Sequence, residues 1–421
     1  MIQIKNKEIK LQEICLYKYE NGKMKIHYLT PEAETKKRFC IEEQMTEERY
    51  KELKTQIDSI RKYPRLYFIV NPFSGTKKGK QIMEDIETYL HCMNITYTVQ
   101  YTTHAGHERE IAESENFDDY DIVVAGGGDG TLHSIINGIL DQHKEEPKPI
   151  SPLPCGSGNG VAFSMYKDSD PLTAMCHIAT GDVTSVDGFV LDHKDVGKRY
   201  YGILQFEFAY LSSIDFESEC VRWLGAARFI IWTLWYMVKL MCYKAVIKTK
   251  KVLFADKGLC GCNCKECRDN HVDNKIDYTK DIAEQIISRH KDPNDAKSEE
   301  DGWETLPYKS YCMYFFNNFV YGMPGIEFAH GAHRNDGLLD TWILPQERAT
   351  RWRFFGFWIC AIFNWFVPKY VSGFDYFRST ALSIQLEEPM VLGIDGEQLP
   401  EGKRFDIYVA PGLFKTVLKM D

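Results

Sequence analysis

Apolar and polar residues alternate along the chain in two different ways. From about residue 63 to 186, short apolar runs such as RLYFIVNP and DIVVAGGG are separated by segments in which apolar residues have helical spacing. After about residue 186, short alternating runs such as SVDGFVLD, TALSIQLEE and RFDIYVAP follow one another, with turns between them. The first pattern is typical of a parallel sheet wrapped by helices, and the second is typical of antiparallel strands.

These patterns predict an α/β protein with three parts. Residues 1–62 form an N-terminal extension, in which LYKYENGKMKIHY predicts a hairpin and residues 46–62 predict a polar helix. Residues 63–186 form a domain built on a parallel sheet. Residues 187–421 form a mainly antiparallel β-sandwich domain with inserted apolar helices.

Two segments of the second domain are unusually apolar and aromatic. They are FIIWTLWYMVKL at 229–240 and FFGFWICAIFNWFV at 354–367. Both fall short of the roughly eighteen uninterrupted apolar residues that a membrane-spanning helix needs. Two interpretations therefore stay open: buried core helices, or a lipid channel with a surface that dips into a bilayer.

Composition and charge exclude some classes of function. The chain is 44% hydrophobic and 26% charged, which is ordinary for a globular protein. The net charge of −9 argues against a general nucleic-acid binder, so no nucleic-acid partner is predicted. The first residues, MIQIKNKEIK, lack the apolar core of a signal peptide, which favours a cytoplasmic location.

The thirteen cysteines are mostly scattered, which favours free thiols in a reducing compartment. Four of them, Cys260, Cys262, Cys264 and Cys267, lie close together in a polar insertion at 256–304. Four such thiols could bind Zn²⁺, but their spacing is not that of a standard tetrahedral site. The favoured interpretation is free thiols in a mobile loop.

Three glycine-bearing loops follow strands of the predicted parallel sheet. They are NPFSGTKKGK at 71–80, GGGDGT at 126–131 and LPCGSGN at 153–159. The carboxyl ends of parallel strands meet at one edge of a sheet, so these loops should lie together. Glycines let backbone N–H groups approach an anion, and a helix N-terminus adds a partial positive charge. The sequence therefore predicts a site for a phosphate-bearing nucleotide.

One residue in these loops needs a separate explanation, because a carboxylate repels phosphate. Asp129 lies in the middle of GGGDGT. Two explanations are available: it helps to hold Mg²⁺ on the phosphates, or it accepts the proton of an attacking hydroxyl. Both predict a kinase.

The three loops together resemble the diacylglycerol-kinase superfamily of lipid kinases, through NPFSGTKKGK, GGGDGTLHSIINGIL and LPCGSGNGVAFS. The later stretch SSIDFESECVRWLGAARF resembles the block found in sphingosine kinases. The resemblance runs from about Arg65 to the C-terminus, without the cysteine-bearing insertion. It implies that ATP phosphorylates the primary hydroxyl of sphingosine, giving sphingosine 1-phosphate and ADP. Diacylglycerol kinase and ceramide kinase are the near alternatives, and NAD kinase, which shares GGDGT, is a more distant one.

The resemblance also implies roles for individual residues. Asp129 matches the catalytic base, Asp215 matches the aspartate that recognises the amino-alcohol head, and Gly128 and Gly130 also lie at the lipid substrate. Asp395 matches a residue near the metal, which is Mg²⁺. The positions that match nucleotide contacts are Asn71, Pro72, Ser74, Gly75, Thr102, Thr103, Gly126, Gly127, Thr131, Gly156, Ser157, Gly158, Arg222, Arg228, Gly396 and Glu397.

The sequence departs from the family pattern at several positions. Ser134 stands where some members carry glutamate, and Phe73 stands where a basic residue is common. The motif DGLLD at 336–340 is closer to the broader lipid-kinase pattern, which keeps another lipid substrate open. The expected partners are a sphingoid-base lipid, ATP and, by peripheral contact, a membrane. Monomer and homodimer both stay open.

Overall fold

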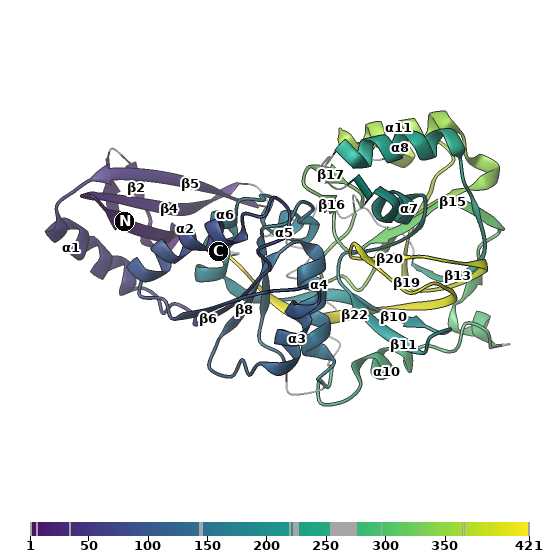
Figure 1. The fold of residues 1–421 in the computed structure, drawn as a ribbon, viewed down its shortest axis with the longest axis horizontal. Coiled ribbons are helices and arrows are strands. Elements are labelled where there is room, and N and C mark those ends of the chain that lie inside the picture. The colour runs from purple at the N-terminus through teal and green to yellow at the C-terminus, as the bar shows by residue number, and fades with distance from the viewer. Residues whose placement is uncertain are drawn as a thin grey trace.

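Three large sheets follow one another along the long axis of the molecule in a computed structural model of the chain (Figure 1). The structure describes all residues except 1, 6, 33–34, 143–145, 219, 222–226, 253–275, 296, 330, 364, 366 and 420–421. In Figure 1 the first sheet is purple, the second is blue, and the third runs from teal through green to yellow.

The first sheet is antiparallel, with the strand order β3-β4-β5. Asn21 and Gly22 join β3 to β4, and both have a positive φ, 52° and 75°, as a tight hairpin turn with a right-handed strand twist requires. Thr46 accepts a hydrogen bond from the backbone N–H of Arg49 at 3.3 Å and so caps α1. The elements are β1 (Ile2–Ile4), β2 (Lys7–Ile9), η1 (Leu11–Glu13), β3 (Ile14–Glu20), β4 (Lys23–Glu32), β5 (Thr35–Gln44) and α1 (Glu47–Asp58).

The second sheet is parallel, with the strand order β7-β6-β8-β9. The chain leaves β6 toward one side and returns to the other side for β8, so β6 and β8 flank a topological switch point, where α/β sheets bind ligands. The strands are β6 (Leu66–Val70), β7 (Tyr97–Tyr101), β8 (Ile122–Gly127) and β9 (Ile150–Pro154). The helices are α2 (Gly79–Cys92), α3 (His107–Ser114), α4 (Asp129–Leu140), α5 (Gly160–Tyr166) and α6 (Pro171–Thr180).

The third sheet is antiparallel, with a continuous path β11-β10-β22-β19-β13-β15-β12-β20-β21. Strand β18 pairs with both β15 and β19, and β14 pairs with β13. The strands are β10 (Asp182–His193), β11 (Lys198–Gly202), β12 (Gln205–Ala209), β13 (Tyr243–Val252), β14 (Glu304–Thr305), β15 (Ser310–Asn317), β18 (Leu339–Pro345), β19 (Asp375–Met390), β20 (Gly393–Ile394), β21 (Glu397–Gln398) and β22 (Gly402–Leu418). A small separate hairpin consists of β16 (Tyr321–Met323) and β17 (Ile326–Glu327).

The predicted fold class is confirmed, because a parallel sheet with helices precedes a mainly antiparallel part. One strand connects the two: β22 pairs with β10 and β19, and its last residues enter the core of the parallel sheet. There the backbone N–H of Val417 donates to Ser151 Oγ at 3.1 Å. The division at residues 62 and 186 stays a proposal.

Four helices of the second half, with the short η4 (Gln346–Arg348), accompany the antiparallel sheet: α7 (Tyr210–Glu217), α8 (Ala227–Lys239), α11 (Arg351–Ile362) and α12 (Val367–Tyr370). Figure 1 shows α8 and α11 side by side at the top right, and Arg351 Nη2 donates to the carbonyl oxygen of Val238 at 3.0 Å. Among the helices that the structure describes, none is long and apolar enough to cross a membrane.

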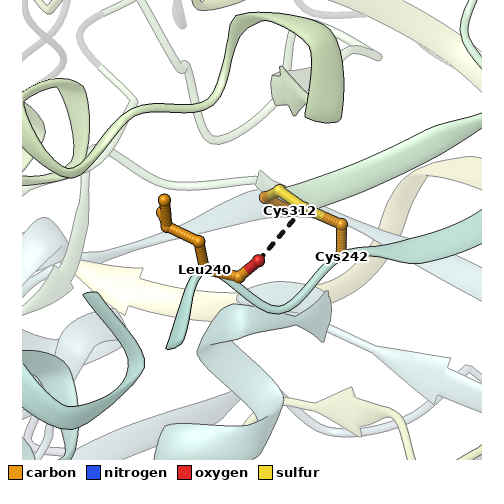
Figure 2. The surroundings of a disulfide bond; sticks show 3 residues. All are labelled: Leu240, Cys242 and Cys312. Carbon is orange, nitrogen blue, oxygen red and sulfur yellow. Dashed lines mark hydrogen bonds between the residues drawn. A yellow bond between two sulfur atoms is a disulfide. The ribbon is translucent and has the colours of Figure 1, made fainter. Parts of the chain in front are cut away.

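The expectation of free thiols is wrong for two cysteines. Cys242 and Cys312 form a disulfide, which joins the start of β13 to β15 (Figure 2). The sulfur of Cys242 lies 3.5 Å from the carbonyl oxygen of Leu240, just after α8. Seven other described cysteines are free. The spacing of cysteines in the sequence carries no signal for this pair, because strand pairing brings the two residues together across 70 positions.

The expectation of a mobile loop at 256–304 is wrong for its second half. Residues 276–304 contain α10 (Ile282–Ile287) and η3 (Ser298–Asp301). Ile282 and Ile286 are buried, and Trp303 is buried and donates from Nε1 to the carbonyl oxygen of Lys291 at 3.1 Å. Few but well-spaced apolar residues therefore suffice to dock this segment. Cys260, Cys262, Cys264 and Cys267 lie outside the described residues.

Candidate functional site

The three glycine-bearing loops meet at the carboxyl ends of β6, β8 and β9. The backbone N–H of Asn71 donates to the carbonyl oxygen of Gly126 at 2.8 Å. The N–H groups of Cys155 and Gly156 both donate to the carbonyl oxygen of Gly127, at 2.9 and 3.1 Å. Backbone hydrogen bonds thus fix the loops to one another, as the sequence predicted from the strand pattern.

Two glycines allow these loops to come this close. A Cβ on Gly156 would stand 2.5 Å from the Cα and 2.8 Å from the N of Gly128. A Cβ on Gly75, which has a φ of 53°, would stand 2.7 Å from the carbonyl carbon of Gly156. Side chains at either position would therefore push the backbones apart.

The remaining predicted nucleotide positions surround this contact. Thr102 directly follows β7 and is buried. Its backbone N–H donates to the carbonyl oxygen of Val70 at 2.9 Å. The neighbouring Thr103 N–H donates to His107 Nδ1 at 3.1 Å. The side chain of Thr131 is buried against Gly127. Pro72 is buried, Ser74 is half-buried and Ser157 is exposed.

Asp129 is the first residue of α4, and α5 orients its carboxylate. Oδ2 accepts from the N–H of Gly160 at 2.8 Å, and Oδ1 accepts from the N–H of Val161 at 3.0 Å. Although the residue keeps some exposure, its carboxylate is surrounded by protein atoms. Burial raises its pKa to about 6 against the lowering effect of the two N–H groups, and the charge of Asp395 raises it further. Such a carboxylate is ionised at neutral pH and basic enough to accept a proton.

Asp395 and Gly396 form the turn of the β20–β21 hairpin beside α4, and Glu397 is the first residue of β21. Asp395 and Gly396 both have a positive φ, 54° and 82°, which is typical of an Asp-Gly hairpin turn. Asp395 is buried, whereas Glu397 is exposed and its carboxylate lies where a Cβ of Gly130 would stand. The carboxylate that faces the start of α4 is therefore that of Glu397.

Two polar residues of the site were missed by the sequence analysis. His133 lies on α4, one turn after Asp129, and contacts the carboxylate of Asp395. Asn159 has a φ of 60° and closes the third loop, because Oδ1 accepts from Gly156 N–H at 3.0 Å and Nδ2 donates to Gly156 O at 2.8 Å. His133 could have been found from the sequence, because it lies four residues after Asp129 and therefore on the same face of the helix.

The predicted residues of the later block are only partly described. Asp215 lies in α7, which directly follows β12. Arg228 lies in α8. The structure does not describe the side chains of Asp215 and Arg228. Arg222 lies outside the described residues. Their roles stay predictions.

The residues present fit Mg²⁺ only as a partner of bound phosphate. Within the described part of the chain, no group of three or more His, Cys, Asp or Glu side chains could hold a metal ion. Mg²⁺ commonly takes one or two carboxylates together with phosphate oxygens and water. Glu397, the exposed carboxylate beside Gly130, would hold it together with bound phosphate, and the chemistry that Mg²⁺ would supply there is neutralisation of phosphate charge.

Residues 65–191 match the model of the diacylglycerol kinase catalytic domain, a segment that contains all three loops and Asp129. Over these residues the chain is similar to the diacylglycerol kinase family. The matched segment includes the parallel sheet and most of β10, the first strand of the antiparallel part.

Curated relatives of this chain differ in the substrates that their names give. Sphingosine kinase 1 of Arabidopsis thaliana is 30% identical over 188 residues, which are 42% of this chain and 38% of that protein. Sphingosine kinase 2 of the same plant is 26% identical over 70% of this chain and 60% of that protein. Human ceramide kinase is 26% identical over 55% of this chain and 47% of that protein. The chain thus spans less than two thirds of the length of these relatives.

Solved structures support the fold of this chain. A crystal structure of a diacylglycerol kinase from Bacillus anthracis superposes with a TM-score of 0.54, at 14% identity, over 85% of this chain and 98% of that one. At this identity the likeness concerns the fold alone. It extends beyond the matched domain and includes the antiparallel part.

Proposed function

We propose that the protein transfers the γ-phosphate of ATP to the primary hydroxyl of a sphingoid base such as sphingosine. The observation that carries this proposal is the position of Asp129, a buried and oriented carboxylate at the point where three glycine-bearing loops meet. A carboxylate inside a phosphate-binding loop has a use if a hydroxyl must lose a proton there.

In the proposed reaction, the loops around Gly127 and Gly156 hold the phosphates through backbone N–H groups. Asp129 accepts the proton of the lipid hydroxyl as its oxygen forms a bond to the γ-phosphorus. The bond between that phosphorus and the bridging oxygen to the β-phosphate breaks, and ADP leaves. Because the pKa of Asp129 is raised to about 6, mainly by burial, the base is ionised at neutral pH.

The choice of a sphingoid base rests on Asp215 and on the relatives. A protonated amine is stabilised by a carboxylate, and ceramide and diacylglycerol carry no free amine. Two of the plant relatives are named sphingosine kinases, whereas the human ceramide kinase keeps the second candidate substrate open. Asp215 lies in α7, the helix that follows β12.

An aromatic cluster beneath α8 and α11 is the proposed place for the lipid tail. Tyr236 of α8 and Phe354 and Phe357 of α11 are buried against Phe315 and Trp342 of the sheet. Burying a methylene group contributes about 0.8 kcal/mol, so a long alkyl chain would bind here largely by desolvation. The apolar residues of α8 and α11 thus fit both interpretations given by the sequence, because one side of each helix is core.

A substrate panel tests the proposal. Purified protein with Mg²⁺ and labelled ATP is offered sphingosine, ceramide and diacylglycerol in parallel micelles. We expect labelling of sphingosine, and at least about a tenfold loss of it in Asp215→Asn, since a charged hydrogen bond contributes about 1.5–3 kcal/mol. Asp182→Asn, which removes an exposed carboxylate at the start of β10, is the control. Labelling of ceramide or diacylglycerol instead would keep the kinase and refute the sphingoid substrate.

The outer sides of the same helices support the proposed contact with a membrane. Trp352 is 82% exposed and Trp235 is 53% exposed, and Leu234, Val238, Phe355, Phe363 and Trp365 are also exposed. So many large apolar side chains on neighbouring helices form a surface that a bilayer can cover.

This surface gives a prediction for vesicle binding. The double variant Trp352→Ser, Phe355→Ser is expected to bind phosphatidylcholine vesicles at least about tenfold more weakly in cosedimentation, because each buried aromatic side chain contributes about 1.5–3 kcal/mol. Phe39→Ser, an exposed aromatic residue of β5, should bind like the wild type. Equal binding by all three proteins would contradict the assignment of this surface.

A further inference from the structure

The carboxylate of Asp395 accepts four hydrogen bonds inside the protein. Oδ1 accepts from the N–H groups of Leu204 and Gln205, at 2.8 and 3.0 Å. Oδ2 accepts from the N–H of Ile203 at 2.8 Å and from Nδ1 of His133 at 2.9 Å. A carboxylate has about four lone-pair sites, so this one is saturated.

The four donors come from two different parts of the fold. His133 lies on α4, which begins with Asp129. Of the three backbone donors, Ile203 and Leu204 join β11 to β12, and Gln205 is the first residue of β12. Strand β12 leads directly into α7 with Asp215. The backbone N–H of Asp395 also donates to the carbonyl oxygen of Gln205 at 3.0 Å. Asp395 thus holds one helix and one strand at the same time.

A second contact parallels this one, a further turn along α4. Asn137 Nδ2 donates to the carbonyl oxygen of Tyr201 at 2.7 Å, and Asn137 Oδ1 accepts from the N–H of Tyr201 at 3.0 Å. His133 and Asn137 therefore lie on the face of α4 that is fastened to the antiparallel sheet. Both residues are buried, so water does not compete for these bonds.

We propose that Asp395 is a positioning residue, not a metal ligand: through His133 it fastens the helix that begins with Asp129 to the strand that leads into the helix of Asp215. The two carboxylates at the proposed reaction centre come from the two sides of this junction. Alignment of the base with the lipid head then depends on the junction, since a misplacement of about 1 Å can cost about a hundredfold in rate. The kinetic part of this inference rests on the proposed function.

The neighbouring Glu397 provides the contrast. It belongs to the same hairpin, two residues after Asp395, but it is exposed beside Gly130. A metal that neutralises phosphate charge would contact this exposed carboxylate, whereas Asp395 has no lone pair left to give. The two acidic residues of GIDGEQ therefore have different roles.

The test uses the full-length protein and the variants Asp395→Asn, His133→Gln, their combination, and Glu397→Gln. We expect Asp395→Asn to lower turnover per ATP-binding molecule by about tenfold or more, with less than about a twofold change in the KM for ATP. The Mg²⁺ concentration for half-maximal activity should stay the same in Asp395→Asn and rise in Glu397→Gln. His133→Gln should act in the same direction as Asp395→Asn, and the combined variant should be hardly worse than Asp395→Asn alone.

Urea unfolding of the wild type, Asp395→Asn, His133→Gln and their combination makes the test independent of the substrate. The losses of stability from Asp395→Asn and His133→Gln should not be additive, because they remove one shared contact. Additive losses, rescue of Asp395→Asn by added Mg²⁺, or unchanged turnover per ATP-binding molecule would each overturn the proposal. If neither the wild type nor any variant phosphorylates a lipid, the proposed function fails. The comparison of unfolding free energies then decides alone whether Asp395 fastens α4. If Asp395→Asn does not fold, His133→Gln carries the same comparison.

Discussion

Replacing Asp129 by asparagine is expected to lower turnover by about a thousandfold while ATP still binds. The substitution removes the proposed general base, and such bases contribute about 10²–10⁴ to rate. Asparagine can still accept one of the two N–H bonds from Gly160 and Val161, so the start of α5 stays in place. The measurements are transfer of labelled phosphate to sphingosine and calorimetric titration with ATP.

The pH dependence of the wild type gives a second view of the same residue. The pKa of Asp129 is raised to about 6, mainly by burial, and only the ionised form accepts a proton. Activity should therefore fall as the pH falls through about 6, by about tenfold per further pH unit. Asp119→Asn, which changes an exposed aspartate three residues before β8, at the opposite end of that strand from the glycine-bearing loop, is the control and should keep both the rate and this profile. Substantial turnover in Asp129→Asn would refute the assignment of the base.

Replacing Gly156 by alanine is expected to weaken ATP binding by about tenfold or more and to lower the unfolding temperature. The new Cβ would stand 2.5 Å from the Cα of Gly128, so one of the two loops must move. Forcing a methyl group into a packed site costs about 1–3 kcal/mol. Thermal unfolding with and without ATP, together with calorimetric titration, measures both effects.

Gly128, the other residue of this contact, supplies the control. A Cβ on Gly128 would have its nearest neighbours at 3.5 and 3.8 Å, and its φ of −98° suits alanine. Gly128→Ala should therefore unfold at the temperature of the wild type. If Gly156→Ala also behaves like the wild type in both measurements, the close approach of the two loops is not required for ATP.

The fold class followed from the sequence because its signals are local. Buried parallel strands such as Leu66–Val70 appear as apolar runs, and half-buried strands such as Tyr243–Val252 appear as alternation. The path of the antiparallel sheet has no such local signal, since β10 pairs with β22 across more than two hundred residues. The disulfide between Cys242 and Cys312 likewise depends on a non-local pairing, that of β13 with β15, and for that reason the sequence did not indicate it.

The candidate site was also predictable only where its signals are local in the sequence. Glycines after a strand indicate a loop that can approach an anion. Because the three loops and Asp129 follow parallel strands, the sequence placed them on one edge of the sheet. The partners of Asp395 could not be predicted, because three of the four are backbone N–H groups, which any sequence provides. The family resemblance placed Asp395 near the metal and Glu397 at the nucleotide. The structure distinguishes the two residues by their exposure, since Asp395 is buried and Glu397 is exposed.

The course of β22 has a consequence for the synthesis of the protein. Ser151 of β9 is fully buried, and its hydroxyl meets Thr416 Oγ1 at 3.2 Å and the N–H of Val417. On a ribosome, the parallel sheet emerges early, but these partners follow only 265 and 266 residues after Ser151, which takes roughly ten to fifty seconds at usual rates of translation. A core that begins to form early is therefore completed late, and until then the hydroxyl of Ser151 lacks its native partners.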